Sequence, residues 1–168
     1  MEEITISTKK HILTYGLILG LIWLIYGVIR YLTNNIITSH WGLPIIELSI
    51  HISIIIYGIY TYKSNNGGFL KLSQALKIGF SIALIGTGIQ ILWDIILLKI
   101  ISPEIVDQLI SLNKKQTVNE LTNQENTIDN KTNIIFIRSL ISLIGNLVLG
   151  ILISLFAGAI MQKKRNEY

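Results

Sequence analysis

The fold is decided by residues 65–101, NNGGFLKLSQALKIGFSIALIGTGIQILWDIILLKII. The paired glycines near its start predict a turn with positive φ, and Ser73 is the expected N-cap of the helix that follows. From Ala75 onward the stretch is apolar and long enough to cross a hydrocarbon core of about 30 Å as a helix. Gln90 and Asp94 lie one helical turn apart within it. The stretch therefore predicts a transmembrane helix with polar groups towards one end.

The composition excludes an ordinary soluble domain. Of 168 residues, 51% are hydrophobic and only 14% are charged, whereas soluble domains are about 25% charged. The net charge of +4 comes from basic residues at the ends of apolar segments, so no nucleic-acid partner is expected. With no cysteine in the chain, disulfides, thiolate metal sites and a cysteine nucleophile are excluded.

Four apolar segments are long enough to span a membrane. Lipid offers the backbone no hydrogen-bond partners, so each segment is expected to be a helix despite its many isoleucines. The first is too long for a signal peptide and no small-x-small cleavage site follows it. We therefore expect an all-α bundle forming a single domain, 1–168, with spans at about 11–33, 43–62, 75–101 and 134–161.

The long third connection, about 102–133, contains a helix-start signal. Ser102-Pro103-Glu104 provides a cap, a proline at the first position and an acid in the first turn. Apolar residues then recur on one side, which predicts a short amphipathic helix lying on the outer membrane surface. Residues 113–133 are rich in Asn, Thr and Gln, which predicts irregular structure.

The basic residues predict the orientation. They stand before the first span, beside the 63–74 connection and after the last span, and are absent from 34–42. The positive-inside rule then places both termini in the cytoplasm. Lys114, Lys115 and Lys131 oppose this placement, but neighbouring acids offset them. The abundance of Ile, Asn and Lys suggests an AT-rich bacterial genome and hence a multi-pass protein of the bacterial inner membrane.

Two helices carry polar or small residues along one face. In the first span, Gly16, Gly20, Trp23, Gly27 and Arg30 alternate at spacings of four and three, which places them on one side. The fourth span has a ridge in steps of four: Arg138, Ser142, Asn146, Gly150, Ser154 and Gly158. Small residues allow close helix approach. Packing within the chain is the preferred interpretation, and a homo-oligomer contact is the alternative.

The glycine turn and the helix entry after it resemble a known family. The motif consists of Gly67, Gly68, Phe69, Ala75, Lys77 and Gly79. It is similar to the signature of a bacterial four-helix membrane family catalogued as domain of unknown function 4199. The placement of Tyr15-Gly16, Trp93, Ser102-Pro103-Glu104 and Lys163-Lys164 is also similar, whereas Leu72 and Leu76 stand where aromatic residues are expected. The resemblance implies the fold and carries no activity, substrate or catalytic residue.

Polar residues are expected to gather at one depth in the membrane. Counted from the outer helix ends, they lie within about 17 Å of the surface. Unpaired ions in lipid are costly, so such groups face the bundle interior and find partners. Glu47 and His51 can touch at i and i+4, and Asp94 could meet either arginine. The predicted cluster, around a water-accessible pocket, comprises Arg30, Glu47, His51, Gln90, Asp94, Arg138 and Asn146.

This cluster has three interpretations. The polar pairs can hold the helices in register, which is ordinary in membrane bundles. They can take up a proton or cation from outside through Glu47, His51 and Asp94. A divalent metal site using His51, Glu47 and His40 is the third, although one i,i+4 pair lacks the further ligands of such a site. No metal or cofactor is assigned.

The function expected from these features is that of a non-catalytic structural or regulatory membrane module. Its partners would be the lipid bilayer and either a membrane protein or further copies of the chain. The alternative is an oligomeric proton- or cation-linked transporter or channel, although no broken helix or repeat supports it. An enzyme is not expected, because no nucleophile elbow, zinc motif, phosphate loop or redox pair is present.

Overall fold

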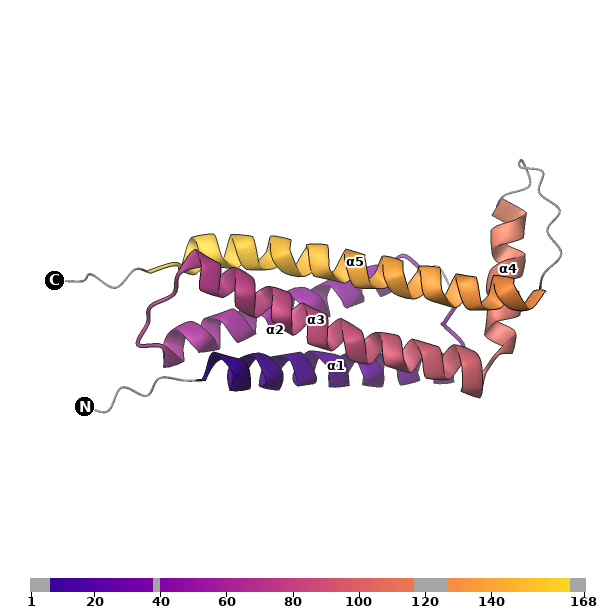
Figure 1. The fold of residues 1–168 in the computed structure, drawn as a ribbon, viewed down its shortest axis with the longest axis horizontal. Helices are drawn as coiled ribbons and strands as arrows, with labels where there is room; N and C mark the ends of the chain where they lie inside the picture. Colours follow the sequence, from indigo (N-terminus) through magenta and orange to yellow (C-terminus); the bar gives the residue numbers. More distant parts are fainter. Residues whose placement is uncertain (1–6, 38–39, 117–126, 164–168) are drawn as a thin grey trace.

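The computed structural model describes residues 7–37, 40–116 and 127–163. Over those residues the chain forms five α-helices and no β-strand. Four long helices run side by side, while α4 lies across one end of the bundle (Figure 1). The predicted all-α bundle with a short helix in its third connection is confirmed. The helices are α1 (Thr8–Leu32), α2 (Gly42–Asn65), α3 (Leu72–Ile96), α4 (Glu104–Gln116) and α5 (Thr127–Met161).

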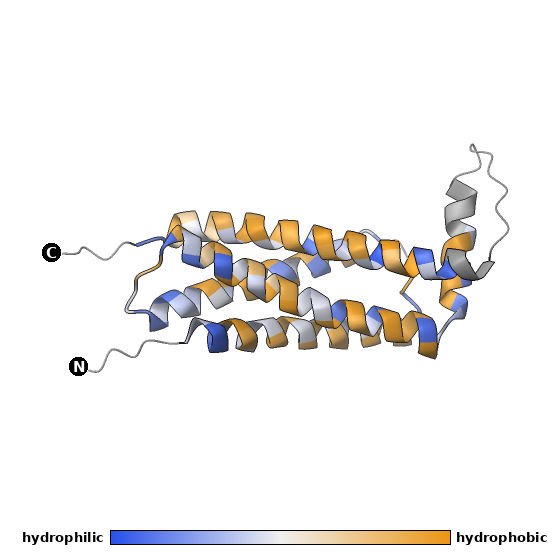
Figure 2. Cartoon of the chain, in the orientation of Figure 1, coloured by the Kyte–Doolittle hydropathy of each residue, from blue (hydrophilic) through white to orange (hydrophobic). Residues whose placement is uncertain are grey.

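All four long helices are apolar enough to cross a membrane. Figure 2 shows hydrophobic residues along most of the bundle and hydrophilic ones mainly towards its two ends. Large apolar side chains such as Phe156 and Ile160 are exposed on the outside of the bundle, as expected where lipid is the solvent. The candidate spans are Thr8–Leu32, Gly42–Asn65, Leu72–Ile101 and Lys131–Met161.

The third connection is more helical than its composition suggested. α4 continues to Gln116 and α5 already begins at Thr127, so the predicted irregularity is wrong at both ends of 113–133. The remainder of that prediction, 117–126, lies outside the described residues. Flanking helices can extend into polar sequence because helix formation propagates once it has been nucleated.

α3 is the central helix, with α1 packed on one side and α5 on the other. The predicted glycine face of α1 lies against α3. A Cβ atom added at Gly20 would lie 2.2 Å from Ile89, and one added at Gly16 would lie 2.7 Å from Ile85. The small residues of α1 thus bring two backbones close together within one chain.

The ridge on α5 packs against small residues of α3. Ser154 faces Gly79, and Gly150 and Gly158 face Ala83 and Ala75. Each four-residue step on one helix meets a four-residue step on the other, as in ridges-into-grooves packing. The small-residue faces of both α1 and α5 therefore contact α3.

The entry to α3 confirms the glycine turn and corrects the cap. Gly67 and Gly68 have φ values of 65° and 80°. Leu70, next to the turn, is fully buried and forms an antiparallel bridge with Lys163 through hydrogen bonds of 3.0 and 2.9 Å. The predicted Ser73 cap is wrong. The helix begins at Leu72, and Lys71 is its N-cap. The backbone N–H of Lys71 donates a hydrogen bond to the Gln74 carboxamide oxygen.

The end of α3 departs from regular α-helix. Leu97–Ile101 form a π-helical turn, although the predicted span was uniformly α-helical to Ile101. α4 starts immediately afterwards, and its apolar residues Ile105 and Val106 pack with Leu98 and Ile135. One side of the amphipathic helix therefore covers the end of the bundle, which we call the α4 end.

A polar cavity near the α4 end

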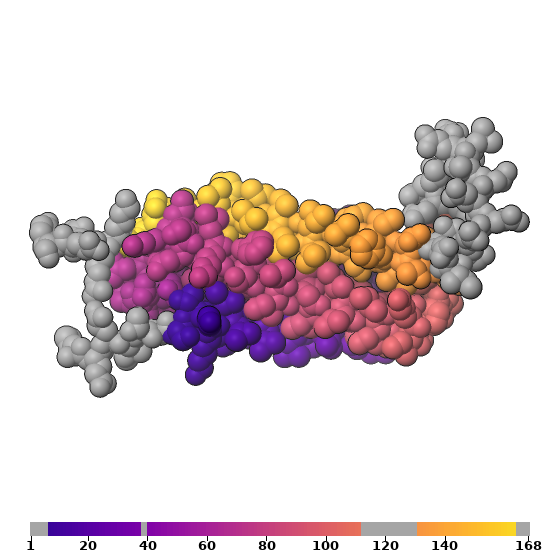
Figure 3. Space-filling view, in the orientation of Figure 1, coloured from indigo at the N-terminus to yellow at the C-terminus, as the bar shows by residue number. Residues whose placement is uncertain are grey.

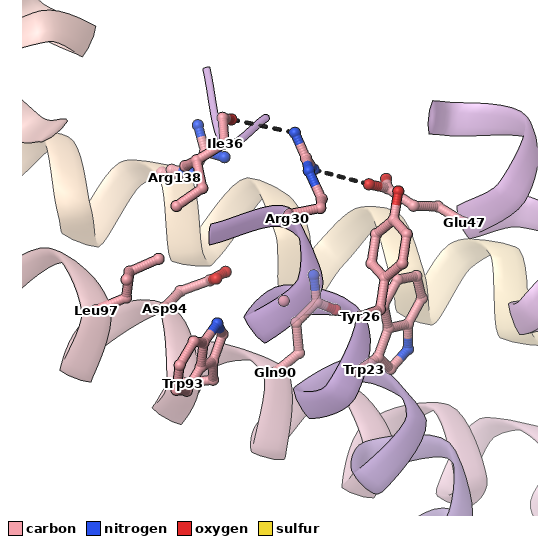
Figure 4. Close-up of a pocket in the computed structure, with 11 residues that line it drawn as sticks. Trp23, Tyr26, Arg30, Ile36, Glu47, Gln90, Trp93, Asp94, Leu97 and Arg138 are labelled. Carbon is pink, nitrogen blue, oxygen red and sulfur yellow. Dashed lines mark hydrogen bonds and ion pairs between the residues drawn. The ribbon is translucent and has the colours of Figure 1, made fainter. Parts of the chain in front are cut away.

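All four long helices contribute to a cavity of about 50 Å³ near the α4 end. A single water needs about 10–15 Å³ of such space, so the cavity has room for a few water molecules. Figure 4 shows its charged and aromatic side chains converging from different helices. The lining residues are Trp23, Tyr26, Gly27, Arg30, Ile36, Glu47, Gln90, Trp93, Asp94, Leu97 and Arg138.

Arg30 binds both a carboxylate and two backbone carbonyls. Its Nη1 lies 2.9 Å from Glu47 Oε1. Its other nitrogens donate to the Asn35 oxygen at 3.1 and 2.8 Å and to the Ile36 oxygen at 3.1 Å. The guanidinium also lies 5.9 Å from the centre of the Tyr26 ring, within cation–π range. Arg30 thus joins α1, the connection after it and α2, and its hydrogen-bonding capacity is largely used.

A second polar contact joins α2, α3 and α5. The Asn146 amide donates to Gln90 Oε1 at 3.1 Å, and His51 Nε2 lies 3.2 Å from the Asn146 backbone oxygen. A carbonyl can only accept, so Nε2 is the donor. Because Gln90 also lines the cavity, this chain of contacts connects the buried His51 to it.

Asp94 is the carboxylate of the cavity that lacks a direct partner. Its side chain is half-buried, and within the described part of the chain it forms no ion pair within 4 Å. Figure 4 shows the carboxylate pointing toward the same space as the Gln90 amide and the Trp93 indole, with Arg138 beyond it. An acidic group in this position is exposed to the water that the cavity can hold.

Several buried polar atoms around the cavity have no hydrogen-bond partner in the described part of the protein. They include the indole nitrogens of Trp23 and Trp93 and Nδ1 of His51. Trp23 is only 4% exposed. Buried polar groups are nearly always paired, with ordered water where protein partners are absent. These atoms therefore indicate a hydrated interior near the cavity.

The predicted cluster is brought together, but some of its expected pairs are absent. Arg30, Glu47, Gln90, Asp94 and Arg138 line the cavity, and Asn146 and His51 join it through the contacts above. The expected contact between Glu47 and His51 is replaced by contacts to α1 and α5. The expected ion pair of Asp94 with an arginine is not formed.

Among the described residues, His40 is not one of those that line the cavity. Its Nδ1 accepts a bond from the Gly42 N–H at 3.2 Å, and its ring stacks on Trp41. Within the described residues no three His, Asp or Glu side chains come together as a metal site.

The sequence reasoning missed the aromatic lining of the cavity. Trp23, Tyr26 and Trp93 all contribute to it. Figure 4 shows the Tyr26 hydroxyl beside the Glu47 carboxylate. The available signal was the position of Trp23 on the glycine face of α1 and of Trp93 one residue before Asp94. The indole of Trp93 lies over Gly27, where an added Cβ would be 2.4 Å from its nitrogen.

The family model described as "Protein of unknown function (DUF4199)" matches residues 14–163. The chain belongs to this family. The match includes most of each membrane-spanning helix, all of α4 and the residues that line the cavity. No curated protein and no solved structure matches the chain. The family description names no activity, so a function has to be inferred from the geometry of the cavity.

Proposed function

We propose that this protein is a non-catalytic regulatory module of the bacterial inner membrane whose cavity takes up a proton or small cation at Asp94. The observation that carries the proposal is the half-buried Asp94 carboxylate. It faces a cavity with room for a few water molecules and has no ion-pair partner in the described part of the chain. Ionisable groups inside membrane bundles are rare and commonly mark ion or proton paths.

The proposed orientation places the α4 end outside the cell. The start of α1, the end of α5 and the connection between α2 and α3 share the opposite end of the bundle (Figure 1). Lys9, Lys10, Lys63, Lys71 and Lys163 lie near those ends. The positive-inside rule supports a cytoplasmic position for that end and for both termini. Asp94 would then face the outer half of the membrane.

The charges around Asp94 favour reversible uptake over permanent pairing. Arg30 faces it from α1, Glu47 from α2 and Arg138 from α5. Arg30 is held by Glu47 and two carbonyls, while the Arg138 side chain is exposed at the surface of the bundle. The environment is close to electrically neutral, so one added positive charge changes the local balance substantially in a medium of low dielectric constant. The space suits a proton or a small cation better than an organic substrate.

Tryptophan fluorescence offers a direct test, because two of the three tryptophans line the cavity. Trp41→Phe removes the third, which is exposed. In nanodiscs, the emission of this variant should change through one transition during a pH titration, and Asp94→Asn in the same background should remove that transition. A sodium titration at fixed pH separates cation uptake from protonation.

His51 provides the control, since its ring centre lies 6.3 Å from that of Trp23. His51→Gln in the Trp41→Phe background should retain the transition. An unchanged titration in Asp94→Asn, or its loss only in His51→Gln, would contradict the proposal.

A second candidate is an oligomeric proton- or cation-linked transporter. The observation in its favour is that the cavity contains charged groups from every spanning helix. Proteoliposome flux distinguishes the two candidates: the regulatory module gives background flux with and without Asp94→Asn, whereas a transporter loses measurable flux in that variant.

A further inference from the structure

A second hollow lies between α3 and α5, and its lining is mostly apolar, unlike that of the polar cavity. It encloses about 350 Å³, within the range of roughly 300–1,000 Å³ usual for small-ligand sites. Its lining includes Ile91, Ile95, Ile135 and Leu143, with Lys99 and Thr132 nearest the α4 end. Figure 3 shows α3 and α5 lying along each other in this part of the bundle. The hollow is thus a largely apolar groove with polar groups at one end.

The length of this groove matches one leaflet of a bilayer. Along α5, Thr132 and Leu143 are separated by about 16 Å at 1.5 Å per residue. Half of a hydrocarbon core of about 30 Å is about 15 Å. An acyl chain that lies in the groove would therefore reach from the level of Lys99 to the middle of the membrane.

The charge at the groove end is unpaired. Lys99 is exposed and forms no ion pair with any described residue, whereas Lys131 nearby is paired with Asp107 at 2.6 Å. Lys99 lies in the π-helical turn, between the apolar span and α4. Its ammonium can therefore meet a phosphate at the level of the lipid headgroups.

We propose that this groove binds one anionic phospholipid of the leaflet at the α4 end. An acyl chain packs on Ile91, Ile95, Ile135 and Leu143. The headgroup phosphate binds the Lys99 ammonium. A single lysine near a membrane surface favours an anionic lipid by about 1 kcal/mol, or about five-fold.

The side chains of the groove favour a lipid over a second copy of the chain. Close helix–helix contacts in membranes need small residues. The glycines of the α3–α5 interface, Gly79, Gly150 and Gly158, are already covered by contacts within this chain. Apart from Ser139 and Thr132, the residues that line the groove have branched or long side chains. Such side chains pack well on an acyl chain but keep a helix backbone at a distance.

Native mass spectrometry of the full chain tests the proposal. The protein is released from micelles containing equal amounts of phosphatidylglycerol and phosphatidylcholine, and bound lipid is counted. One phosphatidylglycerol should be retained by the parent, and Lys99→Gln should lower its preference over phosphatidylcholine about five-fold. Lys77→Gln is the matched control, because Lys77 is an exposed lysine near the other end of α3, and it should change nothing.

Ser139→Phe tests the acyl chain separately, because Ser139 lines the groove and a phenyl ring would fill it. This variant should lose both lipids while keeping its helical circular dichroism. An unchanged lipid preference in Lys99→Gln overturns the proposal. A second outcome also overturns it: Ser139→Cys forms a disulfide-linked dimer and retains no lipid. The test is specific, because the chain has no other cysteine.

Discussion

The two halves of the bundle use the same helices in opposite ways. Away from the α4 end, Gly79 and Ala83 of α3 meet Ser154 and Gly150 of α5 with almost no space between the backbones. Towards the α4 end, Gln90 and Asp94 continue the same face of α3 but border a cavity. Where the residues along this helix face change from small to polar, a close contact between helices gives way to a polar cavity.

This difference separates the part that gives stability from the part that leaves room for a ligand. In lipid there is no hydrophobic force between helices, so close packing of small residues is a main source of association. Polar contacts between membrane helices contribute only about 0.6 kcal/mol on average. We therefore expect substitutions in the close-packed half to destabilise the protein most.

Gly79→Val should have the largest effect. An added Cβ atom would lie 2.4 Å from that of Ser154, so the two helices would have to separate. We expect unfolding free energy to fall by about 3 kcal/mol, the upper part of the range for overpacking, measured by denaturation in mixed micelles. Gly88→Ala is the control, because nothing lies within 4 Å of its added Cβ atom. Equal effects of the two variants would remove the distinction between close-packed and open regions.

Arg30→Gln should have the next largest effect. It removes the ion pair with Glu47 and the charged donors to the Asn35 and Ile36 carbonyls. A loss of about 2 kcal/mol follows from hydrogen bonds to charged groups, reduced because both side chains are partly exposed. Glu47→Gln and the double variant complete a cycle that measures the pair itself. Additive single effects would show that the contact contributes little.

Asp94→Asn should act in the opposite direction. The unpaired carboxylate costs solvation free energy that a neutral amide avoids. The variant should therefore be more stable at neutral pH by about 1 kcal/mol, the lower part of the range for an unsatisfied buried polar group. Denaturation in the same micelles measures this gain, and Asp107→Asn serves as a control outside the cavity because its carboxylate is paired with Lys131. Destabilisation by Asp94→Asn would instead mean that Asp94 is firmly paired in the membrane.

Much of the fold could be predicted because its causes are local. Hydropathy determines which segments are spans, and two successive glycines allow the positive φ values of Gly67 and Gly68. The π-helical turn at Leu97–Ile101 could not be predicted, since no glycine or proline marks it. The turn comes directly before Ser102-Pro103, and its residue Leu98 packs with Ile105 and Val106 of α4.

The residues that make up the candidate site could be predicted from the sequence, but their hydrogen-bond and ion-pair partners could not. The free-energy cost of exposing an ion to lipid is enough to place ionic side chains inside the bundle. Which acid meets Arg30 depends on helix rotation and on a connection that folds back to offer the Asn35 and Ile36 carbonyls. The open space beside Asp94 depends further on the Trp93 indole lying over Gly27, a contact between two helices far apart in sequence.

Asn146→Leu should have the smallest effect of these substitutions, and it tests how much the polar half contributes to stability. The variant loses the hydrogen bond to Gln90 but keeps the backbone oxygen that meets His51, so a loss of about 0.6 kcal/mol is expected. Ser154→Ala, four residues before Gly158 on the same ridge, is the matched control. Among the described residues the Ser154 hydroxyl bonds only to carbonyls of its own helix, so removing it should lower the unfolding free energy by less than Asn146→Leu does. If Asn146→Leu instead lowered the unfolding free energy by about 3 kcal/mol, the polar half would contribute as much to stability as the close-packed half. The contacts in the cavity wall would then stabilise the fold as strongly as close helix packing does.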